Sequence, residues 1–199
     1  MEKYGLIGYP LRHSFSIGYF NEKFKSEGIN AEYVNFEIPS INNFMEVIEE
    51  NPNLCGLNVT IPYKRRVLPY CAQLTPAARR CGSVNLLIKG RDGTLTGDNT
   101  DLAGLEFLLR QNGWVLTGQT VVILGSGGTG HTAKAAAEEL GAAEIATVSR
   151  TGELNYENLA KRFGKREFYL INTTPVGMAP QSGVSPLDLQ RFPRCKGVA

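Results

Sequence analysis

A glycine-rich hexapeptide is the clearest chemical signal in this sequence. Residues 125–130 read Gly-Ser-Gly-Gly-Thr-Gly, which fits G-x-G-x-x-G, and they lie between the aliphatic run 121–124 and the alanine-rich stretch 131–140. Glycine permits a tight turn and lets the backbone approach a pyrophosphate, while the N-terminus of a following helix offers unpaired N–H donors. Such a turn can also serve helix–strand packing alone. The strand before it and the helix after it favour dinucleotide binding.

The residues at the end of the next expected strand indicate which dinucleotide is bound. Enzymes that use NAD usually carry Asp or Glu there, to hydrogen-bond the ribose hydroxyls. Here the positions hold Ser149, Arg150 and Thr151, and the nearest downstream carboxylate is Glu153. A guanidinium binds phosphate through a forked, charge-assisted contact, so this tip suits the 2′-phosphate of NADP. An arginine that merely faces solvent is the plainer alternative.

Four polar fragments in the first hundred residues could form a second site. They are 13–16 (His-Ser-Phe-Ser), 58–64 (Asn-Val-Thr-Ile-Pro-Tyr-Lys), 82–85 (Gly-Ser-Val-Asn) and 97–101 (Gly-Asp-Asn-Thr-Asp). Together they supply hydroxyls, an amide, an ammonium and a carboxylate, which suits a small polyhydroxylated acid. Ligands of open α/β sheets bind beyond the carboxyl ends of strands, and two of the fragments lie at such ends. Taken singly, each could instead be a surface residue, a helix cap or a turn, as for Ser16.

The elements that must position these residues alternate along the whole chain. Short apolar runs and amphipathic stretches follow one another, which predicts β-α-β units and mostly parallel sheets. The expected strands are 4–8, 31–36, 54–59, 84–88, 94–96, 120–124, 144–149 and 167–172. The expected helices are 16–27, 41–50, one short helix on each side of Pro76, 101–112, 131–140 and 155–163. Residues 90–93 predict a hairpin turn, and helix 101–112 is expected to join two domains.

Composition excludes several classes of function. The chain has 199 residues with a formal net charge of +2, too small for an electrostatic nucleic-acid footprint. No apolar run approaches the roughly 18 residues that span a membrane, and the N-terminus lacks the apolar core of a signal peptide. With only 2 His and 4 Cys, and no C-x-x-C pair, no metal site is expected. The cysteines are typical of reduced thiols, so we expect a cytoplasmic protein. The four polar fragments favour a small-molecule substrate.

In their order along the chain, these motifs resemble those of the shikimate dehydrogenases, from Tyr4 to about Met178. The family's H-S-x-S segment matches 13–16, including His13, and its N-V-T-x-P-x-K segment matches 58–64. Its G-A-V-N, G-x-N-T-D, N-R-T and N-A-T-P-x-G-M segments match 82–85, 97–101, 149–151 and 172–178. The shared order of so many motifs argues against a chance match.

The resemblance implies a fold and an activity. The expected fold class is α/β, with an N-terminal substrate-binding catalytic domain at 1–101 and an incomplete Rossmann-type domain at 102–199. The implied reaction is the reversible, NADP-dependent reduction of 3-dehydroshikimate to shikimate, on the chorismate route to aromatic amino acids. An NAD-using quinate/shikimate dehydrogenase and a non-catalytic shikimate- or NADP-binding module stay open as alternatives. Neither the oligomeric state nor the preference between shikimate and quinate follows from the sequence.

Roles for individual residues follow from the same resemblance. Lys64 is the expected proton donor, and Asp101 is expected to orient it and to bond a substrate hydroxyl. The expected substrate-binding residues are Ser14, Ser16, Thr60, Lys64, Asn85 and Asp101. The expected NADP(H)-binding residues are Gly125, Ser126, Gly127, Gly128, Thr129, Gly130, Ser149, Arg150 and Thr151. Thr173 is a further candidate, near the nicotinamide ribose.

The chain departs from the family pattern at several positions. Tyr63 stands where His usually precedes the motif lysine, Ser83 replaces Ala, and Ser149 replaces Asn. An acidic residue that often precedes G-A-V-N is not evident around Pro76. Family members continue with a strand carrying D-x-x-Y-x-P and a helix that returns to the substrate domain, so we expect the native protein to continue past Ala199.

Overall fold

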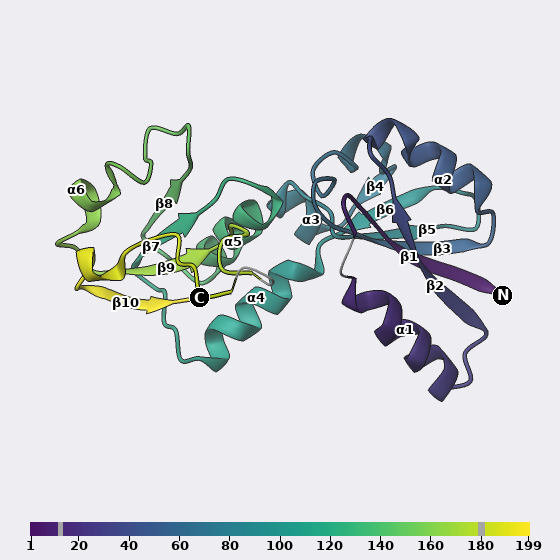
Figure 1. The fold of residues 1–199 in the computed structure, drawn as a ribbon, viewed down its shortest axis with the longest axis horizontal. Helices are drawn as coiled ribbons and strands as arrows, with labels where there is room; N and C mark the ends of the chain where they lie inside the picture. The colour runs from purple at the N-terminus through teal and green to yellow at the C-terminus, as the bar shows by residue number, and fades with distance from the viewer. Residues whose placement is uncertain (12–13, 179–181) are drawn as a thin grey trace. The chain divides into compact units, whose positions relative to one another are not determined.

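The chain divides into two compact units, residues 1–100 and 101–199 (Figure 1). The structure is a computed structural model that describes residues 1–11, 14–178 and 182–199, so His13 lies outside the described residues. Each unit has its own sheet, and strands alternate with helices along the chain as expected of an α/β protein. The predicted fold class is confirmed. The assignment of a substrate domain to 1–101 and a cofactor domain to 102–199 stays a prediction.

The first unit is built on a mixed sheet in the order β2-β1-β3-β5-β6-β4. Its strands are β1 (Glu2–Gly8), β2 (Ala31–Glu37), β3 (Leu54–Val59), β4 (Gln73–Leu74), β5 (Leu86–Lys89) and β6 (Leu95–Asp98). Its helices are α1 (Phe15–Ser26), α2 (Phe44–Glu50) and α3 (Pro76–Cys81), with 3₁₀ turns η1 (Ile41–Asn43) and η2 (Leu68–Tyr70). Strands β1, β2 and β3 are parallel, whereas β5 runs antiparallel to β3 and to β6.

Helices α1 and α2 lie on opposite faces of this sheet (Figure 1). Helix α2 contributes Phe44, Val47 and Ile48 to the main core, where they pack with strand residues such as Leu57. Helix α1 has no fully buried residue, so its position depends more on specific contacts. Its aromatic face stacks Phe20 on Tyr33 of β2, with 4.7 Å between the ring centroids.

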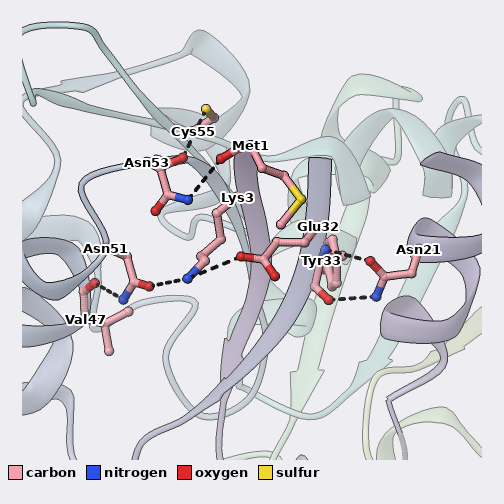
Figure 2. Close-up of polar contacts among 9 residues, drawn as sticks. All are labelled: Met1, Lys3, Asn21, Glu32, Tyr33, Val47, Asn51, Asn53 and Cys55. Atoms are coloured by element: carbon pink, nitrogen blue, oxygen red, sulfur yellow. Dashed lines mark hydrogen bonds and ion pairs between the residues drawn. The ribbon is translucent and has the colours of Figure 1, made fainter. Parts of the chain in front are cut away.

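A side-chain amide holds α1 against the edge strand β2, as Figure 2 shows. Asn21 Nδ2 donates to the carbonyl of Tyr33 (2.8 Å), and Asn21 Oδ1 accepts from the Tyr33 N–H (2.9 Å). Near the start of β1, Lys3 Nζ reaches both Asn51 Oδ1 (2.8 Å) and Glu32 (3.4 Å). The two bonds of Asn21 satisfy backbone groups of Tyr33 that an edge strand would otherwise expose. The two hydrogen bonds of the Asn21 amide therefore fix the position of α1, the helix whose N-cap is Ser14.

The second unit is built on a parallel sheet in the order β10-β9-β7-β8. Its strands are β7 (Thr120–Leu124), β8 (Glu144–Val148), β9 (Phe168–Asn172) and β10 (Cys195–Val198). Its helices are α4 (Thr100–Gln111, which begins one residue before the unit), α5 (Gly128–Glu139) and α6 (Leu159–Phe163), with the 3₁₀ turn η3 (Leu189–Arg191).

Alternation along β7 separates two cores on the two faces of this sheet. Val121 and Ile123 pack with the alanines of α5, whereas Val122 and Leu124 pack with α6, around Phe163. This follows from the two-residue period of a strand, which sends neighbouring side chains to opposite faces. Because both faces are covered, the aliphatic run 121–124 is apolar at every position.

The structure differs from the expected elements mainly at their ends. Helix α5 begins at Gly128 rather than at 131, so part of the glycine motif is helical. Helix α6 begins at Leu159 rather than at 155, because Asn155 and Asn158 bond neighbouring backbone and form a turn. Strand β4 and turn η3 had no recognised signal, since both are very short.

Candidate active site and cofactor loop

The strand register of the first unit brings three of the polar fragments to one edge of its sheet. Asn58 at the end of β3 pairs with Leu86 at the start of β5, and Leu86 pairs with Asp98 at the end of β6. Because β5 is antiparallel to both neighbours, its beginning lies beside their ends. Fragments 58–64, 82–85 and 97–101 therefore start or stop at the same edge.

A buried amide network joins two of these fragments. Asn85, only 8% exposed, accepts from the Thr100 N–H through Oδ1 (2.8 Å) and lies 3.0 Å from the Thr100 hydroxyl through Nδ2. Asn99, 2% exposed, donates from Nδ2 to the carbonyl and the hydroxyl of Ser83, both at 3.0 Å. Its amide fixes the turn that carries Asn85.

Ser14 is the N-cap residue of α1, yet its side chain makes no capping bond. Its Oγ is buried and has no hydrogen-bond partner within the described part of the chain. An unsatisfied buried hydroxyl costs free energy, so it needs a reason to persist. A ligand oxygen would supply the missing partner. This observation fits the predicted role of Ser14 toward a carboxylate.

Ser16 lies in the first turn of α1 and not at its cap, which corrects the alternative that it serves only as an N-cap. Its hydroxyl hydrogen-bonds to the phenol of Tyr33, which in turn donates to Asn58 Oδ1 (2.8 Å). Burial raises the pKa of Tyr33 to about 12, and the bond from Ser16 opposes part of that rise. The phenol therefore stays a donor at neutral pH and links fragment 13–16 to the end of β3.

Lys64 and Thr60 lie in the turn that follows β3. The Thr60 N–H donates to the carbonyl of Ile7 (2.9 Å), and the Lys64 carbonyl accepts from the Val84 N–H (2.7 Å). Between them, Tyr63 is 1% exposed, and its phenol donates to the carbonyl of Ile38 at 2.6 Å. The departure to tyrosine thus adds a buried anchor directly before the lysine, so the lysine backbone is held at two points.

Asp101 begins the second unit and lies half-buried in the first turn of α4. A carboxylate at this place is favoured by the partial positive charge of the helix N-terminus. It directly follows Thr100, whose backbone bonds to Asn85. Its predicted partnership with Lys64 stays a prediction.

The glycine loop runs from the end of β7 into α5 as the motif predicts. Gly125 has a φ of +107°, a backbone conformation that residues with a side chain rarely adopt. A Cβ on Gly130 would lie less than 3.0 Å from the Gly125 carbonyl oxygen. Gly127 is the N-cap, and a Cβ there would meet nothing within 4 Å. Ser126 and Thr129 are exposed, so the open side of the loop has room for a phosphate.

Thr173 supports this loop from the neighbouring strand. Its hydroxyl donates to the carbonyl of Leu124 at 2.6 Å, and its N–H bonds to the same carbonyl at 2.9 Å. Its Oγ1 would meet a Cβ on Gly125 at 2.7 Å. In the structure this residue contacts the loop itself, and its predicted approach to a ribose stays untested.

The tip of β8 carries Ser149, Arg150 and Thr151, of which the last two are exposed. The Ser149 N–H donates to the carbonyl of Leu154 (3.1 Å), which turns the chain back at the strand end. Arg150 lies near the phenol of Tyr156 and opposes the rise that burial causes in that group's pKa. A guanidinium exposed beyond a strand end is free to meet an anionic group.

Sequence reasoning missed three residues whose hydrogen bonds hold the predicted site residues in position. Tyr33, Thr100 and Asn99 all position predicted residues, but none had been assigned a role. Thr100 and Asn99 lie inside a recognised motif, so the motif was the available signal. Tyr33 lies in an ordinary strand, and nothing in its sequence neighbourhood distinguished its phenol.

Two structural features are absent from the described residues. They contain no group of three or more His, Cys, Asp and Glu side chains placed to share a metal ion. No helix in that part of the chain is both long and apolar enough to cross a bilayer.

Comparison with known proteins connects this geometry to a class of enzyme. Residues 6–87 match the family model described as the shikimate dehydrogenase substrate binding domain. The shikimate dehydrogenase (NADP(+)) of Syntrophomonas wolfei is 35% identical over 94% of this chain and 71% of that protein. The corresponding protein of Oleidesulfovibrio alaskensis is 36% identical over 93% of this chain and 70% of its own length.

Solved structures agree with this result. Shikimate dehydrogenase 1 from Peptoclostridium difficile superposes with a TM-score of 0.85 at 31% identity, over 100% of this chain and 76% of the other. A Thermus thermophilus enzyme in complex with NADP(H) and shikimate gives 0.75 at 30% identity, over 97% and 76%. The fold and the two sets of polar residues define a dinucleotide-dependent α/β dehydrogenase. More narrowly, the chain belongs to the shikimate dehydrogenase family.

Proposed function

We propose that this chain catalyses the reversible, NADP-dependent reduction of 3-dehydroshikimate to shikimate, on the chorismate route to aromatic amino acids. The observation that carries the proposal is the gathering of the family's polar fragments at one sheet edge, in a chain 35% identical to a shikimate dehydrogenase (NADP(+)) over 94% of its length. The buried Ser14 hydroxyl, which lacks a hydrogen-bond partner in the described part of the first unit, supports a ligand with a carboxylate.

The residues of the second unit fit an NADP molecule. Gly130 lets α5 start close to Gly125, where a side chain would collide, and Gly127 leaves open space at the N-cap. Donors at this helix start would hold the pyrophosphate. Arg150 at the tip of β8 would hold the 2′-phosphate. When bound, NADPH supplies the hydride for the reaction.

Lys64 is the residue to which we assign proton transfer. Reduction of a ketone places negative charge on its oxygen, and a general acid must deliver a proton there. The backbone of Lys64 is held by the bond from Val84 and by the buried phenol of Tyr63. Asp101 would orient the ammonium and accept a bond from a ring hydroxyl.

The substrate would be recognised by groups that are already arranged. Ser14 and Ser16 would donate to the carboxylate, while Thr60, Asn85 and Asp101 would read ring hydroxyls. Such a site rejects an analogue that lacks a hydroxyl, because buried polar groups are then left unpaired. The bonds that fix Asn85 to Thr100 reduce the ordering cost on binding.

We place the reaction in the cytoplasm. All four cysteines are free in the structure, which is typical of a reducing compartment. The small net charge of +2 gives no reason to include a nucleic acid among the partners.

Steady-state kinetics of shikimate oxidation test the assignment. Lys64→Ala should lower kcat by about 10²–10⁴, the usual effect of losing a general acid or base, with a much smaller change in KM. Asp101→Asn should affect both kcat and KM. The double variant should be little slower than Lys64→Ala, because residues that act as a unit are not additive.

The matched control is Lys25→Ala, which removes an exposed lysine of α1 and should keep wild-type kinetics. Near wild-type turnover of Lys64→Ala would remove this lysine from the chemistry. Binding of both ligands without any turnover by the wild-type chain would favour the non-catalytic module. A preference for NAD(H) and quinate would favour the other alternative.

A further inference from the structure

Tyr33 holds helix α1 against the sheet through three different kinds of contact. Its backbone N–H and carbonyl both bond to the amide of Asn21, as Figure 2 shows. Its ring stacks on Phe20 with 4.7 Å between the centroids and an interplanar angle of 17°. Its hydroxyl bonds to Ser16 in the first turn of the helix. Because α1 has no fully buried residue, its attachment depends strongly on this one tyrosine.

The phenol of Tyr33 also sets the direction of a short hydrogen-bond chain. Asn58 Oδ1 carries no proton, so the phenol is the donor in the bond between them, at 2.8 Å. A phenol has a single proton, and this bond uses it. Ser16 must therefore donate in its own bond to the phenol oxygen. The chain runs from Ser16 through Tyr33 to Asn58 and orients the serine hydroxyl and the amide together.

This chain spans one strand of the sheet and ends at the candidate site. Strand β1 lies between β2, which carries Tyr33, and β3, which carries Asn58 near its end. Tyr33 is only 3% exposed, so water does not compete for its hydroxyl. Burial raises the pKa of Tyr33 to about 12. The phenol therefore keeps its proton, and the chain keeps its direction, at neutral pH.

We propose that Tyr33 is a positioning residue for substrate binding, which places the Ser16 hydroxyl before the substrate arrives. The inference rests on the proposed function, in which Ser16 bonds to the substrate carboxylate. In the free chain the Ser16 proton is directed at the phenol. A carboxylate is a charged and stronger acceptor, and it can take that proton by rotation of the hydroxyl alone. The side chain then needs no further ordering on binding, which lowers the cost of association.

The two serines of fragment 13–16 therefore differ in how they are prepared for a ligand. Ser14 Oγ is buried without a hydrogen-bond partner, so no side chain in the described part of the chain orients its proton. Ser16 already has a partner in the phenol of Tyr33. Loss of the phenol hydroxyl should thus affect binding through Ser16 and not through Ser14.

Tyr33→Phe tests the proposal, because it removes only the hydroxyl and keeps the ring and the backbone bonds. KM for shikimate should rise about fivefold or more, as expected for the loss of one hydrogen bond. The kcat and the KM for NADP⁺ should stay within about twofold of the wild type, because the lost bond serves ground-state binding of one substrate. A merely structural loss would instead lower the folded fraction, and with it the apparent kcat, at unchanged KM.

Tyr4→Phe is the matched control for this variant. Tyr4 lies directly beside Tyr33 in the register of β1 and β2, and the pKa of its phenol is also raised to about 12. Its hydroxyl donates to Glu2 at 2.9 Å and takes no part in the chain to Asn58. Removal of this second phenol hydroxyl should therefore leave KM for shikimate unchanged.

Double variants identify the residue through which the phenol acts. In a Ser16→Ala background, Tyr33→Phe should raise KM little further, because the group that it positions is already gone. In a Ser14→Ala background, the same increase of about fivefold or more should reappear. The contrast between the two backgrounds does not depend on the size of either single effect.

Amide hydrogen exchange tests the positioning in the absence of any ligand. Without the phenol hydroxyl, the first turn of α1 loses its bond to the sheet through Ser16. The amides that bond to the carbonyls of this turn should exchange about fivefold or more faster in Tyr33→Phe than in the wild type. The amides of β2 should exchange as in the wild type, since the bonds of Asn21 to Tyr33 are kept.

Three results would overturn the positioning role in a chain that oxidises shikimate. They are a wild-type KM in Tyr33→Phe, an undiminished rise of KM in the Ser16→Ala background, and wild-type exchange in the first turn of α1. A wild-type chain that neither binds nor oxidises shikimate would instead refute the proposed function, and this inference with it. Calorimetric titration of the wild type with shikimate distinguishes the two kinds of failure.

Discussion

Alanine substitutions at two glycines of the same loop should distinguish an effect on protein stability from an effect on cofactor affinity. In Gly130→Ala, the new methyl would lie less than 3.0 Å from the carbonyl oxygen of Gly125 and 3.1 Å from its carbonyl carbon. Both atoms belong to the backbone, so neither can rotate away. In Gly127→Ala, the methyl would meet nothing within 4 Å, and φ of −79° suits any residue.

The expected magnitudes follow from these contacts. Overpacking against backbone costs about 3 kcal/mol at the upper end of the usual range. Alanine recovers about 1 kcal/mol of that within a helix. Gly130→Ala should therefore lose about 2 kcal/mol of unfolding free energy, or about 8–16 °C in the melting temperature of the second unit. Gly127→Ala should stay within about 0.5 kcal/mol of the wild type, because a poorer cap offsets a stiffer unfolded chain.

Cofactor binding should fall in both variants. The methyl of Gly127→Ala would occupy the space through which the loop backbone approaches a pyrophosphate. Thermal unfolding followed by circular dichroism measures the first quantity, and calorimetric titration with NADP⁺ measures the second. The reasoning is refuted if Gly130→Ala is as stable as the wild type. It is also refuted if Gly127→Ala unfolds as early as Gly130→Ala.

Three further predictions concern single side chains. Arg150→Ala should weaken NADP(H) about ten- to a hundredfold but leave NAD(H) almost unchanged, because one charge-assisted contact to the 2′-phosphate is lost; equal losses in titrations of both cofactors would contradict this. Ser14→Ala should raise KM for shikimate about tenfold or more, while unfolding free energy stays the same or rises, since the lost hydroxyl had no partner; a destabilised variant with normal KM would reverse the assignment. Tyr33 has its pKa raised to about 12, so its contribution is intact below the unfolded value near 10 and is lost as pH rises through 12. Tyr33→Phe should therefore reduce the fall of unfolding free energy between pH 10 and 12 by about 1.4 kcal/mol per pH unit, as denaturant titrations at each pH would measure.

Strong local signals predicted most of the fold correctly. The aliphatic run before the glycine motif and the alanines after it specify β7 and α5 with little help from distant residues. The boundary error at Gly128 has a simple cause, because glycines are poor helix formers and were assigned to the loop. At this position the N-terminal turn of the helix tolerates them, and Gly130 is required by close packing.

Long-range arrangement was harder to predict, because no local pattern encodes it. The hairpin turn at 90–93 predicted that β5 and β6 are adjacent, but not that β5 also pairs with β3. That pairing is what brings Asn58 and Asp98 to one edge. The motifs indicated which residues matter, whereas their meeting depends on a register that a single sequence does not reveal.

The short connection after β8 determines two features that no local pattern predicted: the position of Arg150 at the strand tip and the uncovered outer edge of β8. A Cβ on Gly152 would lie 2.6 Å from Ser149 Oγ, and Leu154 bonds back to Ser149, so the chain reverses within a few residues. This tight reversal holds Arg150 at the strand tip, where a 2′-phosphate would lie. The same reversal leaves no length for a further strand beside β8 before α6 begins. The geometry that presents the arginine therefore also leaves the β8 edge at Thr147 without a neighbouring strand in the described part of the chain.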